Sequence, residues 1–202
     1  MSSYHKQYRT LPYFVGKAFS EIPLVAFFSF LFGSITYRLT GLSRAAGKFR
    51  NFSALLFTHG LVSEGMGLLI GALSPSSDIA LSVFPAILVL NIIFDGRNIS
   101  EENTPRLLRW IPKLGLIRWG FEGLGINEFD GLSFDTSGLR RGPVAKTGIE
   151  ALARFGLGTR TLVDVFQAQL LITGSFWILS FLGLTLTRQR FLEMKAPAEP
   201  KD

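Results

Sequence analysis

Four runs of mainly apolar residues constrain the fold of this chain more than any other feature. They cover residues 22–39, 52–73, 79–94 and 166–187. A helix rises about 1.5 Å per residue, so about 20 apolar residues cross the hydrocarbon layer of a bilayer. Backbone N–H and C=O groups in that layer must be paired within the chain, which a helix achieves. The sequence therefore predicts an all-α membrane protein with four transmembrane helices.

Composition favours membrane lipid over nucleic acid as the main partner. Of the 202 residues, 18% are charged, against about a quarter in soluble domains. The net charge is +6, but the basic residues lie at the ends of the apolar runs, where they suit anionic headgroups. We therefore expect no nucleic-acid partner. The sequence has no cysteine, which excludes disulfides and thiolate metal sites, and the spacing of its histidines predicts no metal site.

Residues 95–165, between the third and fourth runs, form a connector that is too long for a turn. Its first half mixes cationic side chains with aromatic rings, which suits the headgroup layer of a membrane. A soluble amphipathic helix would look similar in isolation. The residues concerned are Arg106, Arg109, Trp110, Arg118, Trp119 and Phe121. Further along, Thr147 and Glu150 have the spacing of a capping box and predict the start of a short helix.

The two ends of the chain differ in character. Apolar residues recur at helical spacing in residues 8–21, which predicts an amphipathic helix that lies along the membrane face and leads into the first span. The alternative is the start of an ordinary buried helix. Residues 191–202 form a tail, which beyond Met194 is rich in Pro, Lys and Glu and is expected to be disordered.

An even number of spans would place both termini on one side of the membrane. Basic residues near the termini favour the cytoplasmic side. The connection between the first and second runs argues for the opposite orientation, because it is also basic. Its cationic residues are Arg38, Arg44, Lys48 and Arg50.

Three polar side chains that lie within the apolar runs are candidates for function: His59, Glu64 and Asn91. A carboxylate at mid-span costs about 2.5–3.5 kcal/mol unless it is paired or neutral. Glu64 could take part in a proton relay with His59, or it could form a structural hydrogen bond with a neighbouring helix. The second interpretation is favoured. The second run also contains Gly67 and Gly71, whose spacing predicts the close approach of another helix.

Two further pairs of residues belong to the connections between the runs. Arg118 and Glu122 are four residues apart on an expected helix, close enough to pair. They could form a hinge that controls an external gate or a static brace, and the brace is favoured. Asn51 and Asn98 each fit the Asn-x-Ser pattern of N-glycosylation and lie near membrane ends.

Several segments occur in an order and at a spacing that match a known family. They are Tyr8-Arg-Thr-Leu-Pro-Tyr13-Phe-Val-Gly-Lys17, Tyr37-Arg-Leu-Thr-Gly41-Leu42, Arg109-Trp-Ile-Pro112, Arg118-Trp-Gly-Phe121, Asn127-Glu-Phe129-Asp-Gly131 and Gly148-Ile-Glu150-Ala-Leu152. Together they resemble the membrane domain of G-subfamily (white-type) ABC half-transporters, from the entry of its third helix to the element before its last helix. The resemblance covers about residues 8–190.

The resemblance implies a partial ABC-2 type transmembrane domain that supplies the last four of six helices. It also implies a coupling helix at residues 8–21 that touches a nucleotide-binding domain, a partly re-entrant external element at residues 105–129, and a substrate pathway along the third run. The implied residues are Tyr8, Arg9, Tyr13, Lys17 and Glu21 in the coupling helix, Leu88, Val89, Ile92 and Asp95 in the pathway, and Arg118, Glu122, Asn127 and Glu128 in the external loop.

The sequence contains no Gly-x-x-x-x-Gly-Lys-Ser/Thr loop, so no ATPase site is expected in this chain. ATP and Mg²⁺ are expected on a separate nucleotide-binding domain, and a second half-transporter is expected as the partner in a homodimer or heterodimer. The implied function is ATP-driven export of lipid, sterol or amphipathic small molecules. The alternative is a truncated, non-transporting membrane protein that pairs with intact half-transporters and modulates them. A membrane-embedded enzyme has no catalytic set to support it.

Overall fold

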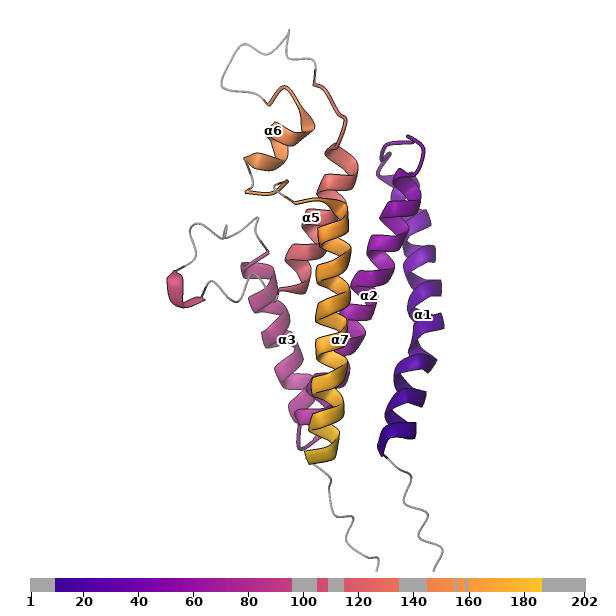
Figure 1. The fold of residues 1–202 in the computed structure, drawn as a ribbon, viewed down its shortest axis with the longest axis vertical. Helices are drawn as coiled ribbons and strands as arrows, with labels where there is room; N and C mark the ends of the chain where they lie inside the picture. Colours follow the sequence, from indigo (N-terminus) through magenta and orange to yellow (C-terminus); the bar gives the residue numbers. More distant parts are fainter. Residues whose placement is uncertain are drawn as a thin grey trace, which may run out of the picture.

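The computed structural model shows a bundle of helices (Figure 1). It describes residues 10–95, 105–108, 115–134, 145–154, 156–158 and 160–186. The helical elements are α1 (Thr10–Leu39), α2 (Lys48–Leu73), α3 (Ser77–Ile93), η1 (Arg106–Leu108), α5 (Leu116–Phe129), α6 (Gly148–Ala153) and α7 (Leu162–Leu186). Within the described residues, strand-type pairing is limited to an isolated bridge between Ser133 and Thr147. The all-α prediction is confirmed.

In the described part of the chain, three helices are long and apolar enough to cross a membrane: α1 with 30 residues, α2 with 26 and α7 with 25. α3 is also apolar but has 17 residues. At 1.5 Å per residue this is about 26 Å, somewhat less than the roughly 30 Å hydrocarbon layer. The prediction of membrane-spanning helices is confirmed for α1, α2 and α7, whereas a fourth crossing by α3 stays a prediction.

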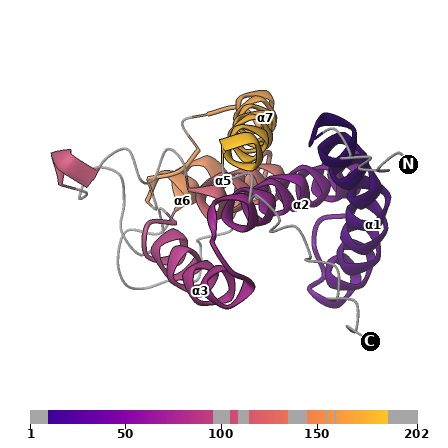
Figure 2. The ribbon, with the colours of Figure 1, turned by 90° about the horizontal axis from the view of Figure 1, so that it is seen from below.

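The long helices alternate in direction along the bundle. α1 and α3 run one way and α2 and α7 the other, so that Thr10 and Leu186 lie at the same end (Figure 1). The opposite end holds the α1–α2 connection, the C-terminus of α5 and the whole of α6 (Figure 1). Viewed along the bundle, α1 and α3 lie on opposite sides of α2, while α7 packs against α2 (Figure 2).

α1 differs from the expected pairing of a surface helix with a separate span. It is one continuous helix from Thr10 to Leu39, with no break between residues 21 and 22 and with Pro23 inside it. The N-terminal part packs on α7 through aromatic rings: Phe14 and Phe181 have ring centroids 5.7 Å apart, and Phe19 and Trp177 have centroids 6.2 Å apart. These contacts hold the first turns in line with the rest of the bundle.

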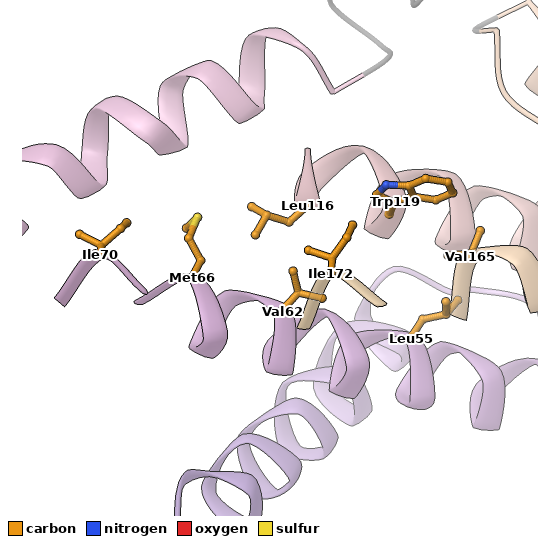
Figure 3. Close-up of a cluster of buried hydrophobic side chains, with 8 residues drawn as sticks. All are labelled: Leu55, Val62, Met66, Ile70, Leu116, Trp119, Val165 and Ile172. Atoms are coloured by element: carbon orange, nitrogen blue, oxygen red, sulfur yellow. The ribbon is translucent and has the colours of Figure 1, made fainter. Parts of the chain in front are cut away.

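The core of the bundle lies where α2, α5 and α7 meet (Figure 3). It combines four side chains from α2 with two from each of the other helices. They are Leu55, Val62, Met66, Ile70, Leu116, Trp119, Val165 and Ile172. A segment of the long connector therefore contributes directly to the core of the membrane bundle.

Glycines set the close packing of α2 on α7. A Cβ atom at Gly65 would lie 3.2 Å from Phe176 Cβ, and one at Gly183 would lie 3.4 Å from Ala72 Cβ. The sequence predicted such an approach at Gly67 and Gly71, but neither has an atom of a described neighbour within 4 Å of its Cβ position. The contact lies at position 65 instead, about 200° around the helix from position 67.

We expect Gly65→Val to destabilise the bundle by about 1–3 kcal/mol, because added methyl groups would force α7 away from α2. Gly67→Val is the matched control, since it makes the same change two residues away in open space. Thermal unfolding of the detergent-solubilised chain measures both. Equal destabilisation by the two variants would contradict this account of the α2–α7 contact.

Candidate functional site around the inserted helix

α5 is inserted into the bundle and does not lie flat on its surface. It packs against α2 and α7, and its N-terminus lies beside the C-terminal end of α3 (Figures 1 and 2). Two glycines permit the close fit. A Cβ at Gly120 would lie 2.8 Å from His59 Nδ1, and one at Gly123 would lie 2.8 Å from both Leu55 Cδ2 and Val165 Cγ1. A larger side chain at either position would force α5 or these neighbouring side chains to move.

Asn91 on α3 caps the N-terminus of α5. The first N–H groups of a helix have no partner within it, and Gly115 at the N-cap position has no side chain to supply one. Instead, the Leu116 N–H donates to Asn91 Oδ1 at 3.0 Å, while Asn91 Nδ2 donates to the Ile87 carbonyl at 2.9 Å. The predicted intramembrane polar residue Asn91 therefore joins two helices.

The C-terminus of α5 is held by the start of α2 and the connection before it. Lys48 Nζ donates to the carbonyls of Glu128 at 3.0 Å and Asp130 at 2.7 Å. In return, Asn127 Nδ2 donates to the Lys48 carbonyl at 3.1 Å, and Glu128 Oε1 accepts from the Ser43 N–H at 2.8 Å. A cation is favourable at a helix C-terminus because the last carbonyls carry partial negative charge.

A charged cluster lies along the side of α5. Arg118 and Glu122 are 5% and 1% exposed. Arg160, in the turn before α7, has its Nε 3.9 Å from Glu122 Oε2 and its guanidinium carbon 4.3 Å from the centroid of the Trp119 ring. Sequence analysis missed Arg160, since its partners lie about 40 residues away. Its position just before an apolar run was the available signal.

The other two polar candidates of α2 face different neighbours. Glu64 Oε2 accepts a hydrogen bond from Trp177 Nε1 on α7 at 2.9 Å, whereas His59 packs on Gly120 of α5. This arrangement gives Glu64 a helix-joining role and supports the structural interpretation over a relay through His59.

A second polar link between α2 and α7 was not predicted. The Thr58 hydroxyl on α2 donates to Gln169 Oε1 on α7. Within α7, the Thr173 hydroxyl donates to the backbone carbonyl of Gln169 at 2.9 Å. All three residues are buried. In an apolar surrounding a hydrogen bond between helices, such as that of Thr58 with Gln169, contributes about 0.6–2 kcal/mol to helix association. Gln169 was overlooked because it has no charge to mark it within an apolar run.

The four predicted pathway residues do not share one environment. Leu88 packs against the core, while Val89 and Ile92 are 54% and 50% exposed on another side of α3. Asp95 is half-buried just after α3. The exposed surface of Val89 and Ile92 can face lipid, substrate or another subunit.

The remaining predicted residues are dispersed. Among those of the coupling segment, Lys17 Nζ pairs with Glu21 Oε1 at 2.5 Å, and Tyr13 is exposed. Asn51 lies early in α2, which differs from the flexible loop that a glycosylation site usually occupies. Tyr8, Arg9, Asn98 and the tail 191–202 lie outside the described residues. In the part of the chain that is described, no three His, Cys, Asp or Glu side chains gather as a metal site.

The predicted capping box is present at the start of α6. Thr147 Oγ1 accepts from the Glu150 N–H at 3.2 Å, and Glu150 Oε2 accepts from the Lys146 N–H at 2.6 Å. The return bond goes to the residue before the N-cap, one position earlier than the usual pattern. A Cβ at Gly148 would overlap the Phe129 carbonyl, so α6 lies directly on the C-terminal end of α5.

Comparison with known proteins agrees with the resemblance found in the sequence. Residues 4–129 match the family described as ABC-2 type transporter. The chain is similar to ABC transporter G family member 7 of Arabidopsis thaliana, with 33% identity over 184 residues that cover 91% of this chain and 25% of that protein. It is also similar to Protein white of Drosophila melanogaster, with 31% identity over 91% of this chain and 27% of that protein. The chain spans about a quarter of the length of these relatives.

If Glu64 has a structural role, substitutions at Glu64 and at Trp177 should differ in their effect on stability. Glu64→Gln keeps an oxygen that accepts the Trp177 N–H, so stability should change by less than about 0.5 kcal/mol. Trp177→Phe keeps an aromatic ring but removes the donor, and should cost about 0.6–2 kcal/mol. Thermal unfolding in detergent measures both. Loss of transport in a stable Glu64→Gln protein would show instead that Glu64 acts through its proton.

Proposed function

The chain belongs to the ABC-2 type transporter family, and we propose that it forms the membrane pathway of an ATP-driven exporter of lipids, sterols or amphipathic small molecules. Membership in this family makes it the membrane part of an ABC transporter of the G-family type. Export and the class of substrate are the proposal. The apolar, exposed side chains on α3 suit a substrate that is itself partly apolar.

The observation that carries the proposal is the insertion of α5. Polar contacts from α2, from α3 and from the turn before α7 converge on this one helix. Such an element can close one end of a pathway, because it fills the bundle at the end opposite Thr10 and Leu186 (Figure 1). Arg118 and Glu122 are buried on its flank, which favours a brace that keeps the gate in place.

The proposed pathway lies between two copies of the membrane domain. Val89 and Ile92 are exposed on α3, and a second half-transporter in a homodimer or heterodimer would face them across the pathway. Asp95 would lie at its end. We propose that these residues contact substrate, whereas Leu88 supports them from the core side.

ATP hydrolysis is proposed to come from a nucleotide-binding domain that holds ATP and Mg²⁺, since the sequence contains no phosphate-binding loop. Tyr13, Lys17 and Glu21 lie in the first turns of α1, at the end of the bundle where α7 also ends. We propose that this end is cytoplasmic and contacts that domain. Lys48, which argues against this orientation by its charge, is engaged with the carbonyls that end α5.

Inside-out membrane vesicles test direction, orientation and substrate class together. The full chain is co-expressed with a G-family nucleotide-binding partner, and ATP with Mg²⁺ is added outside the vesicles. We expect uptake of a fluorescent phospholipid or sterol analogue. Ile92→Trp should lower uptake about tenfold, as for a barrier raised by about 1.4 kcal/mol. Leu171→Trp, on an exposed part of α7, is the matched control and should leave uptake unchanged.

The same vesicles separate the alternative function. A chain that co-purifies with an intact half-transporter and lowers the uptake by that partner would be a modulator. Absence of ATP-driven uptake together with absence of co-purification would contradict both functions. ATP-driven uptake of the substrate into right-side-out vesicles that are loaded with ATP would show import, the opposite of the proposed direction.

A further inference from the structure

α3 is the long helix that is most weakly attached to the core. None of its residues is buried. It touches the core cluster through four half-buried side chains, Ala80, Phe84, Ile87 and Leu88. Lipid tails are as apolar as these side chains, so little free energy opposes their separation from the core in a membrane. A single polar contact can therefore determine the position of α3 relative to the rest of the bundle.

Asn91 supplies that contact. Its Oδ1 accepts the Leu116 N–H of α5 at 3.0 Å, and its Nδ2 is held by the Ile87 carbonyl at 2.9 Å. The bond to Ile87 lies within α3 and fixes the side-chain amide in the orientation that aims Oδ1 at α5. The Asn91 side chain is therefore set in place by its own helix before it meets the next one.

Separation of α3 from α5 would leave two polar groups without partners. One is the side-chain carbonyl oxygen of Asn91. The other is the Leu116 N–H at the start of α5, for which no residue of α5 supplies an acceptor. An unsatisfied polar group in apolar surroundings costs about 1–3 kcal/mol. Water that enters between the helices can satisfy both groups. The contact between α3 and α5 is therefore stable in the absence of water and can open when water enters.

Pro85 gives α3 a place to bend. It lies inside the helix, six residues before Asn91. Proline has no N–H, so the carbonyl of Leu81 lacks its usual helical partner, and the helix is weakened there. The segment after Pro85, which carries Val89, Ile92 and Asn91, can move while the segment before it stays.

We propose that Asn91 is a positioning residue that holds the C-terminal half of α3 against α5, and that breaking its bond to Leu116, with entry of water, lets this half swing away about Pro85. The movement would widen the space beside Val89 and Ile92. Its purpose in transport rests on the proposed function, but the movement itself does not require ATP or a partner.

Distances between spin labels test the proposal in the full chain in lipid nanodiscs. The sequence has no cysteine, so spin labels attach only at the introduced cysteines. One pair, Leu90→Cys with Leu171→Cys, joins the segment after Pro85 to α7. A second pair, Leu81→Cys with Leu182→Cys, joins the segment before Pro85 to α7. All four positions are exposed.

We expect Asn91→Leu to shift the first pair to longer distances with a broader distribution and to leave the second pair unchanged. Asn91→Asp keeps both bonds only while its carboxyl group is protonated, because one oxygen then accepts the Leu116 N–H and the O–H replaces the amide as donor to the Ile87 carbonyl. We expect it to leave both pairs unchanged at acidic pH. Ser82→Ala is the matched control, because it removes a 2.9 Å hydrogen bond to Asp78 that stays within α3. It should leave both pairs unchanged.

Two results would overturn the proposal. In the first, Asn91→Leu leaves the first pair unchanged. In the second, it shifts both pairs equally, which would mean a general loosening of α3. The distances are measured without ATP or substrate, so failure of the transport assay and failure of this inference are separate results.

Discussion

Pairing the backbone groups at the two ends of α5 is the requirement on which the rest of the structure depends. A helix inside a membrane bundle has unpaired N–H groups at its start and unpaired carbonyls at its end, and lipid offers them no partner. Asn91 accepts from the first end and Lys48 donates to the second. Because these two residues belong to α3 and α2, satisfying α5 also fixes three helices relative to one another.

The same arrangement divides the bundle into a firm part and a looser part. α2, α5 and α7 share the buried cluster and the close approaches at Gly123 and Gly65. α3 has no buried residue and is joined to α5 through Asn91. A transport pathway needs both properties, since one wall must keep its shape while another moves. The packing therefore places the proposed motion in α3 and the proposed brace in α5.

Sequence reasoning predicted the elements better than their contacts. Length and hydropathy located α1, α2 and α7, because the bilayer imposes a fixed length on any apolar helix. The same reasoning placed the Arg- and Trp-rich segment on the membrane surface, but the structure inserts Trp119 into the core. Its glycines were the missed signal, since Gly120 and Gly123 permit close packing. The contacts of Arg160 and Gln169 were missed, because their partners lie far away in the sequence. Arg160 was marked only by its position before an apolar run, and Gln169 carries no charge.

Disulfide cross-linking in native membranes tests the insertion of α5 most directly. The chain has no natural cysteine. A Cβ at Gly123 would lie 2.8 Å from Leu55 Cδ2, which is two bonds from Leu55 Cβ, so cysteines at 55 and 123 should lie close enough to cross-link on mild oxidation. Cysteines at 72 and 183, whose Cβ positions are 3.4 Å apart on α2 and α7, are the positive control. We expect both pairs to cross-link. A cross-link between 72 and 183 without one between 55 and 123 would show that α5 lies outside the bundle.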